Sequence, residues 1–180
     1  MKYTEGEVYF SILKEVDKPV LSLFKSSDSD LNEFLDDDAS EYQKLNLGIT
    51  YLLLRKNDNK LLSYMTISMG ALKLPEKKAE FLFRGRSLGE YSKSFPNQFP
   101  AILIGKLATD SDEEGKGCAA RLIEIAVKTA LEVRQRIGCS YLVAHAKNTQ
   151  NVITWYETRG FRAYIFDLKG RDTIPMYLEL

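Results

Sequence analysis

The sequence has few cysteines and no run of apolar residues long enough to cross a membrane. Its two cysteines, Cys118 and Cys139, do not suggest a disulfide framework, and no stretch resembles a signal peptide. The 25 basic and 25 acidic residues cancel, which argues against a surface that is basic throughout but allows a local basic patch. We therefore expect a reducing, cytoplasmic setting with no membrane partner.

Histidine is almost absent as well, since His145 is the only one. Strand alternation would place it on one face with Tyr141 and Val143, and a lone histidine is more often structural than a base or a metal ligand. The acidic run at residues 36–38 favours a solvated helix face over a divalent-metal site, because no histidine or glutamate geometry accompanies it. The sequence thus predicts no metal site.

The residues that are present suit one globular domain with a full hydrophobic core. The chain has 180 residues, of which 44% are hydrophobic and 28% charged. Alternating, β-rich or apolar runs predict strands near 8–13, 48–55, 61–72, 100–109, 140–147, 161–166 and 174–180. Helical spacing predicts helices over 29–45, 117–137 and from Asn148 to about Gly160. This order indicates an α/β or α+β protein built on one sheet.

The long predicted helix has an apolar stripe that we expect to face the core, with Gly138 ending the helix. The stripe consists of Leu122, Ile123, Ala126, Ala130, Val133 and Ile137. Between residues 73 and 97 the periodicity breaks down, and the segment contains both basic residues and phenylalanines that need burial. Long irregular segments of this kind are often binding loops.

The stretch Glu114-Gly115-Lys116-Gly117 lies between an apolar strand and that long helix. Glycines spaced this closely allow a sharp turn and a close backbone approach to a ligand. The first N–H groups of the following helix lack partners within it and carry the positive end of its dipole. A phosphate group suits such a place, with Lys116 adding a positive charge, although a glycine turn alone is a weak signal.

Three pieces in order resemble the GNAT N-acetyltransferases: "ILIGKLATD", "EEGKGCAARLIEIA" and "AKNTQNVITWYETRGF". The middle piece resembles the family's Arg/Gln-x-x-Gly-x-Gly/Ala coenzyme A loop, and the last piece resembles its later strand and helix. The segment that begins "LFKSSDSDLNEFL" is similar to the toxin-type branch, whose members acetylate aminoacyl-tRNA. The resemblance implies a mixed α/β fold with a partly splayed central sheet. Coenzyme A would enter between the parallel strands 100–109 and 140–147.

The same resemblance implies a division of the single domain and a set of site residues. Residues 1–99 would form the substrate side, 100–166 the coenzyme A-binding core and 167–180 a C-terminal strand. Tyr156 would give a proton to the departing sulfur. The residues implied in holding acetyl-CoA are Leu107, Ala108, Thr109, Glu114, Gly115, Lys116, Gly117, Cys118, Ala119, Ala120, Asn148 and Asn151. Glu114 departs from the family pattern, because a carboxylate there repels a pyrophosphate unless it turns away.

The chemistry of these residues bears on the acceptor amine. The strand before the loop has no acidic residue until Asp110, whereas many lysine acetyltransferases of the family carry a glutamate there. An α-amine titrates near 7.7–8.0 and a lysine near 10.4, so this absence favours an α-amine. Cys118 lies at a helix start that would lower its pKa, but no base accompanies it. We interpret Cys118 as a small packing residue.

We therefore expect an acetyl-CoA-dependent N-acetyltransferase that acts on a primary amine, either a small amine or a peptide. One alternative is a toxin-type enzyme that acetylates aminoacyl-tRNA, and another is a non-catalytic coenzyme A-binding or interaction module. A homodimer and an antitoxin are further partners that the resemblance admits. Basic residues that would hold the substrate are Lys106, Arg84, Arg86 and Lys93.

Overall fold

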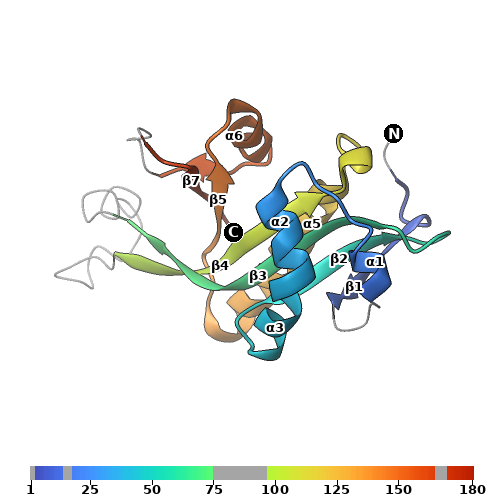
Figure 1. Cartoon of the computed structure of the whole chain (residues 1–180). Helices are drawn as coiled ribbons and strands as arrows, with labels where there is room; N and C mark the ends of the chain where they lie inside the picture. Colours follow the sequence, from blue (N-terminus) through green and yellow to red (C-terminus); the bar gives the residue numbers. More distant parts are fainter. Residues whose placement is uncertain (1–2, 14–17, 75–96, 165–169) are drawn as a thin grey trace. The chain divides into compact units, whose positions relative to one another are not determined.

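The computed structural model describes residues 3–13, 18–74, 97–164 and 170–180 (Figure 1). Contacts divide the chain into two compact units, which are described separately below. The first comprises Met1–Met69 and Ile104–Thr129, and the second comprises Gly70–Leu103 and Ala130–Leu180. The single domain expected over residues 1–180, with its three segments, remains a prediction.

The strands of the first unit form an antiparallel arrangement. β1 (Val8–Ile12) pairs with β2 (Ile49–Arg55), and β2 pairs with β3 (Leu61–Lys73). A bulge lies between Leu53 and Leu54. The turn between β2 and β3 includes Asn59 at φ +56°, a left-handed conformation that asparagine tolerates better than most residues. The predicted hairpin and first strand are confirmed, and a short helix α1 (Lys18–Leu21) follows β1.

The predicted helix over 29–45 is confirmed in extent but contains a π-helical turn. α2 (Ser29–Glu33) leads into the π turn η2 (Phe34–Asp38) and then α3 (Ala39–Lys44), with the carboxylate of Asp28 accepting from the N–H of Asp30 at 3.1 Å. The wider turn places Phe34, Leu35 and Ala39 all in the core. The acidic run at residues 36–38 is exposed, as predicted, and so are Asp30, Glu33 and Glu41.

The core of the first unit lies between this helical segment and the sheet. Figure 1 shows α2 and α3 crossing the strands β2 and β3. Leu52, Leu54 and Tyr64 from the strands pack with Phe34 and Leu35. The hydroxyl of Tyr64 donates to the carbonyl of Leu31 at 2.6 Å, so this buried phenol is satisfied.

The second unit is built on β5 (Tyr141–Lys147), which pairs antiparallel with β7 (Thr173–Glu179). β7 in turn pairs with the short strand β6 (Arg162–Ala163). Edge-to-face aromatic contacts link Phe99, Tyr141, Tyr177 and Tyr164 in its core. The last predicted strands are therefore present, although β6 covers only two of the residues expected at 161–166. Residues 165–169 lie outside the described part of the chain.

Three further features complete the fold. β4 (Gln98–Thr109) and α5 (Cys118–Ile137) confirm the predicted strand and long helix, and the hydrogen-bonded strand order is β1-β2-β3-β4-β5-β7-β6. Gly138, at φ +85°, follows the end of α5 as expected. The mixed α/β class predicted from the sequence is confirmed. No helix among the described residues is long and apolar enough to cross a membrane.

Two details of the helices differ from expectation. The sequence pattern places Ile137 in the core stripe of α5, but the residue is 74% exposed, and the rest of the last turn, residues 134–136, is exposed as well. α6 (Gln150–Glu157) begins two residues later than predicted. Asn148 instead donates its backbone N–H to the carbonyl of Asp172 at 2.8 Å, which holds it in the loop before the helix.

Candidate functional site

The glycine loop has the strand–turn–helix geometry that the sequence predicts. β4 ends at Thr109, a 3-10 turn η4 (Ser111–Glu113) follows, and α5 begins at Cys118. Gly115 and Gly117 adopt φ values of +73° and +89°, which side-chain-bearing residues rarely reach. A Cβ added at Gly115 would meet nothing within 4 Å, so the outer side of the turn is open.

The first turn of α5 offers backbone donors to a ligand. The N–H of Arg121 donates to the carbonyl of Gly117 at 3.4 Å, and the N–H groups of residues 118–120 precede that bond. Such leading N–H groups have no acceptor inside their own helix and lie at its positive end. Glu114 is exposed, so its carboxylate can point into solvent and away from the glycine loop. The loop therefore fits an anionic group such as a pyrophosphate.

Asp110, the first carboxylate after the strand, is buried and fully engaged. It accepts hydrogen bonds from the N–H groups of Lys25 and Asp112 at 3.3 and 3.2 Å, and Lys60 Nζ lies 2.8 Å from its Oδ1. A carboxylate held in this way anchors the chain between β4 and the loop. It is not placed as a free general base.

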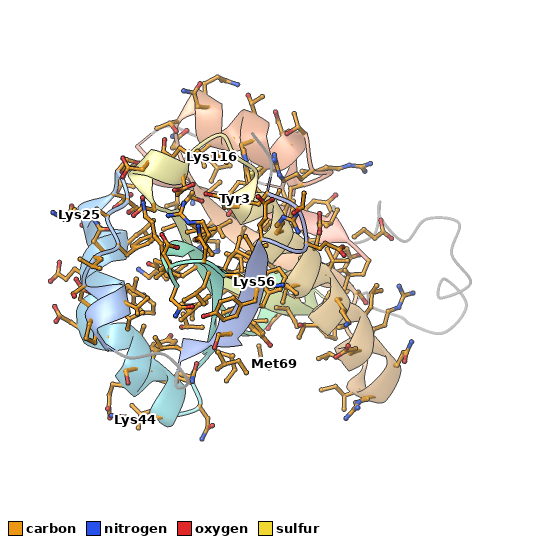
Figure 2. The ribbon with its side chains drawn as sticks, turned by 90° about the vertical axis from the view of Figure 1, so that its right-hand side faces the viewer. Tyr3, Lys25, Lys44, Lys56, Met69 and Lys116 are labelled. Carbon is orange, nitrogen blue, oxygen red and sulfur yellow. The ribbon has the colours of Figure 1, made fainter. Side chains whose placement is uncertain are left out.

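Glu113 is the other buried carboxylate of this region, and it contacts the loop directly. Its Oε2 accepts from the hydroxyl of Tyr3 at 2.7 Å and from Lys116 Nζ at 2.9 Å, while Arg55 Nη1 donates to its Oε1 at 3.4 Å. Figure 2 shows Tyr3 and Lys116 on neighbouring parts of the first unit. Burial alone would raise the pKa of Glu113, but the hydrogen bonds from Lys116 and Tyr3 outweigh it and hold the pKa below its usual value.

The ammonium of Lys116 is therefore committed to an ion pair rather than standing free beside the glycines. The same hydrogen bond from Lys116 to Glu113 raises the pKa of the lysine above its usual value. The sequence pattern does not identify Tyr3, Arg55, Lys60 or Glu113 as part of the site. No local signal reveals them, because Tyr3 and Glu113 are 110 positions apart.

The end of β4 is held by a side chain of β3. Ser63 Oγ donates to the carbonyl of Ala108 at 2.5 Å and lies 3.1 Å from the hydroxyl of Thr109. Leu107 is partly buried beside them. Lys106 Nζ lies 5.0 Å from the ring centroid of Phe34, a cation–π contact with the π-helical turn.

Cys118 has the packing role that the sequence suggests, with only 2% of its surface exposed. The expected lowering of its pKa by the helix start is wrong. Burial dominates and raises the pKa of the thiol, with the charge of Glu113 acting in the same direction. A thiol that stays protonated is a poor nucleophile.

Tyr156 belongs to the second unit, where it is 7% exposed in α6. Its ring packs edge to face against Trp155 and Phe161, with centroids 5.0 and 5.1 Å away. Burial raises the pKa of its phenol well above the usual value, so the hydroxyl is protonated at neutral pH. Within the described ranges its hydroxyl makes no hydrogen bond to the protein, which suits a group that keeps its proton for a ligand.

Of the remaining residues considered in the sequence analysis, some lie in the second unit and others lie outside the described residues. In the second unit, Asn148 Nδ2 donates to the carbonyl of Arg171 at 2.9 Å, and Asn151 is exposed in the first turn of α6. His145 is exposed on β5. Arg84, Arg86 and Lys93 lie outside the described residues. In the described ranges, no group of three or more His, Cys, Asp or Glu residues could hold a metal ion.

Comparison of the sequence with known proteins gives a partial match. No protein-family model matches the chain. A tRNA-acetylating toxin of Mycobacterium tuberculosis (strain ATCC 25618 / H37Rv) is 28% identical over 92 residues, a match that spans 51% of this chain and 51% of the toxin. The alignment thus covers about half the length of that curated relative.

Solved structures match over nearly the whole chain. A structure described as a bacterial toxin has a TM-score of 0.77 at 14% identity, covering 96% of this chain and 90% of the toxin. A Tyr-to-Phe mutant of KacT has a TM-score of 0.75 at 16% identity, covering 96% of this chain and 95% of the KacT chain. AtaT complexed with acetyl-methionyl-tRNAfMet has a TM-score of 0.72 at 20% identity, covering 94% of each chain. These matches confirm the GNAT fold that the sequence predicts.

Proposed function

We propose that this chain is an acetyl-CoA-dependent N-acetyltransferase that acetylates the α-amine of an aminoacyl-tRNA and so acts as a toxin of translation. The observation that carries the proposal is the fold shared, over 94% of both chains, with AtaT complexed with acetyl-methionyl-tRNAfMet. The partial sequence match to a tRNA-acetylating toxin supports the same substrate class. This substrate replaces the small amine or peptide that the neutral net charge favours.

The residues of the glycine loop would hold the pyrophosphate of the coenzyme. Gly115 leaves the outer side of the turn open, Gly117 supplies a second left-handed backbone position, and the leading N–H groups of α5 are the donors. Backbone groups of Leu107, Ala108 and Thr109 would face the acetyl and pantetheine groups, and Asn148 and Asn151 complete the proposed set. Structures of AtaT include complexes with acetyl-CoA, which supports the choice of acetyl donor.

When bound, acetyl-CoA supplies an activated acetyl group and a thiolate leaving group. We assign Tyr156 Oη as the proton donor to that sulfur, because its buried phenol stays protonated. Tyr-to-Phe mutants of both KacT and AtaT are among the structural neighbours, so a tyrosine was chosen for substitution in two proteins of similar fold. With Asp110 engaged by Lys60, the attacking amine needs a low pKa of its own. An aminoacyl α-amine, with a reference pKa of about 7.7–8.0 as an N-terminus, meets this need better than a lysine.

The partners follow from the same proposal. One neighbour is AtaT bound to the C-terminus of the antitoxin AtaR. By analogy we propose an antitoxin for this chain, a homodimer as its working form and the cytoplasm as its place of action. Lys106, and the basic residues Arg84, Arg86 and Lys93, are proposed to contact the tRNA.

The decisive experiment offers the purified protein acetyl-CoA with charged tRNAs, peptides and small amines, and follows the acetylated product. We expect turnover on aminoacyl-tRNA. A site that neutralises about six phosphates would lose on the order of 10³-fold in affinity between about 50 and 200 mM salt. Turnover on peptides or small amines alone, with a flat salt response, would overturn the tRNA assignment.

Coenzyme binding is tested separately by thermal unfolding with acetyl-CoA. A ligand at about 100 times its Kd adds roughly 2.7 kcal/mol to the free energy of unfolding. For a domain of this size the expected rise in Tm is about 5–11 °C. Failure to see either a shift in Tm or heat in calorimetry would contradict the enzymatic proposal and the non-catalytic coenzyme-binding alternative together.

A further inference from the structure

The N-terminal segment contacts the glycine loop through Tyr3. The hydroxyl of Tyr3 donates to Glu113 Oε2 at 2.7 Å and accepts from Arg55 Nη1 at 3.1 Å. Its backbone carbonyl accepts from Arg121 Nη2, in the first turns of α5. One residue near the start of the chain therefore contacts both sides of the loop, the turn before it and the helix after it.

Glu113 connects Tyr3 to the loop itself. The same oxygen, Oε2, that accepts from Tyr3 also accepts from Lys116 Nζ at 2.9 Å, and Lys116 stands between the two glycines. Glu113 is 3% exposed, and a carboxylate buried that deeply must keep its donors. Loss of one donor would leave the carboxylate to rearrange, and Lys116 would move with it.

The turn has little else to fix its conformation. Within the described residues, Lys116 holds it through the ion pair with Glu113 and through one backbone bond from its N–H to the carbonyl of Glu113 at 3.3 Å. Gly115 is exposed, with open space on its outer side, and glycine has more conformations to lose than any other residue. The side-chain contacts that run from Tyr3 through Glu113 to Lys116, which we call the brace, are thus a large part of what holds the loop open for an anion.

We infer that Tyr3 is a positioning residue for the coenzyme loop, acting through Glu113 on Lys116. This inference rests on the proposed function, since it concerns the loop assigned to acetyl-CoA. The brace fixes the direction of the leading N–H groups of α5 before a ligand arrives. Binding then does not have to order the turn, and the ligand keeps more of its interaction free energy.

The test compares three tyrosine-to-phenylalanine variants, each of which removes one phenolic hydroxyl. Tyr3→Phe breaks the brace. Tyr9→Phe removes an exposed bond to Asn59 Oδ1, 3.0 Å long, and Tyr64→Phe removes the buried bond to the carbonyl of Leu31. Neither control bond touches the loop. For each variant one measures Tm, the Kd for acetyl-CoA by calorimetry, kcat and KM, and hydrogen exchange of the amides of residues 114–120.

For Tyr3→Phe we expect a rise of about three- to tenfold in Kd and in the KM for acetyl-CoA, with kcat unchanged, from the loss of one hydrogen bond to a carboxylate. Exchange at residues 114–120 should quicken by a similar factor. Tyr9→Phe should match the wild type in every measurement. Tyr64→Phe should lower Tm yet keep the wild-type Kd, which separates positioning from general stability.

Two outcomes would overturn the inference. In one, Tyr3→Phe lowers Tm as Tyr64→Phe does but leaves Kd and loop exchange unchanged, so that Tyr3 is merely structural. In the other, Tyr3→Phe behaves like Tyr9→Phe throughout. Should the wild type bind no acetyl-CoA, the proposed function fails, and loop exchange in Tyr3→Phe still decides whether the brace exists.

Discussion

Lys60, in the turn between β2 and β3, reaches the buried carboxylate of Asp110 just beyond β4, with Nζ 2.8 Å from Oδ1. The side chain of Asp110 is 5% exposed and that of Lys60 is 26% exposed, so the pair is only partly screened by water. The same ammonium lies 3.7 Å from Glu113 Oε1. One lysine thereby lies close to both buried carboxylates at the 3-10 turn before the glycine loop.

Replacing Asp110 with asparagine, a side chain of nearly the same shape but without the charge, should destabilise the fold. The amide is uncharged and cannot keep the ion pair with Lys60, and we expect a loss of about 1–3 kcal/mol in the free energy of unfolding. Urea unfolding measures this. The control is Glu41→Gln, whose partner Lys44 forms an exposed pair on α3, and its expected change is below about 0.5 kcal/mol. Equal losses in the two variants would contradict a structural role for the Lys60–Asp110 pair.

Glu113 should make the protein sensitive to acid. Its pKa in the folded chain is below the ordinary 4.5, so the unfolded chain binds the proton first. The stabilisation is therefore fully present above pH 4.5 and is lost as the pH falls through the folded-state pKa. The stability gap between wild type and Glu113→Gln, measured by urea midpoints, should shrink as the pH falls from about 7 to about 3. A gap that stays constant with pH would show that the carboxylate charge contributes nothing.

Gly117→Asp should abolish coenzyme binding, because it adds a negative side chain to a left-handed position at the anion site. Gly138→Asp is the matched control. Gly138 has φ +85°, and a Cβ there meets nothing within 4 Å, so the backbone strain is similar but the position lies beyond the far end of α5. Calorimetry with acetyl-CoA should show no binding to the first variant and wild-type Kd for the control. Equal weakening in both would point to strain rather than to the site.

Tyr156→Phe should lower kcat by roughly 10²–10⁴-fold, the usual contribution of one acid–base group. Acetyl-CoA binding should hardly change, since only a hydroxyl is lost from a ring that Trp155 and Phe161 still enclose. Tyr177→Phe, at a similarly buried tyrosine of the same unit, serves as the control and should keep wild-type kcat. Because burial raises the pKa of Tyr156, kcat should show no fall from its ionisation until the pH exceeds 10. Full turnover by Tyr156→Phe would leave the tyrosine a purely structural residue.

The elements that the sequence predicts are those whose signals are local. Alternation locates the hairpin of β2 and β3, and Gly115 and Gly117 mark the turn, because the left-handed backbone there needs residues without a Cβ. The brace from Tyr3 to Glu113 could not be predicted, since it depends on the fold bringing together residues far apart in the chain. The π turn escapes prediction because it shifts the helical register by a single residue. The exposed end of α5 escapes it too, because periodicity does not say how far a core extends.

The acidic helical segment from Asp28 to Glu41 changes what a net charge of zero means. Seven of the 25 carboxylates lie between Asp28 and Glu41, with no basic residue among them, so the rest of the chain carries 25 basic and 18 acidic side chains, a charge of +7. The zero net charge is thus the sum of an acidic segment and a basic remainder, not an even mixture along the sequence. A polyanion would be repelled by the acidic helical segment, and salt would screen that repulsion. A net charge of zero therefore does not by itself argue against a polyanionic substrate.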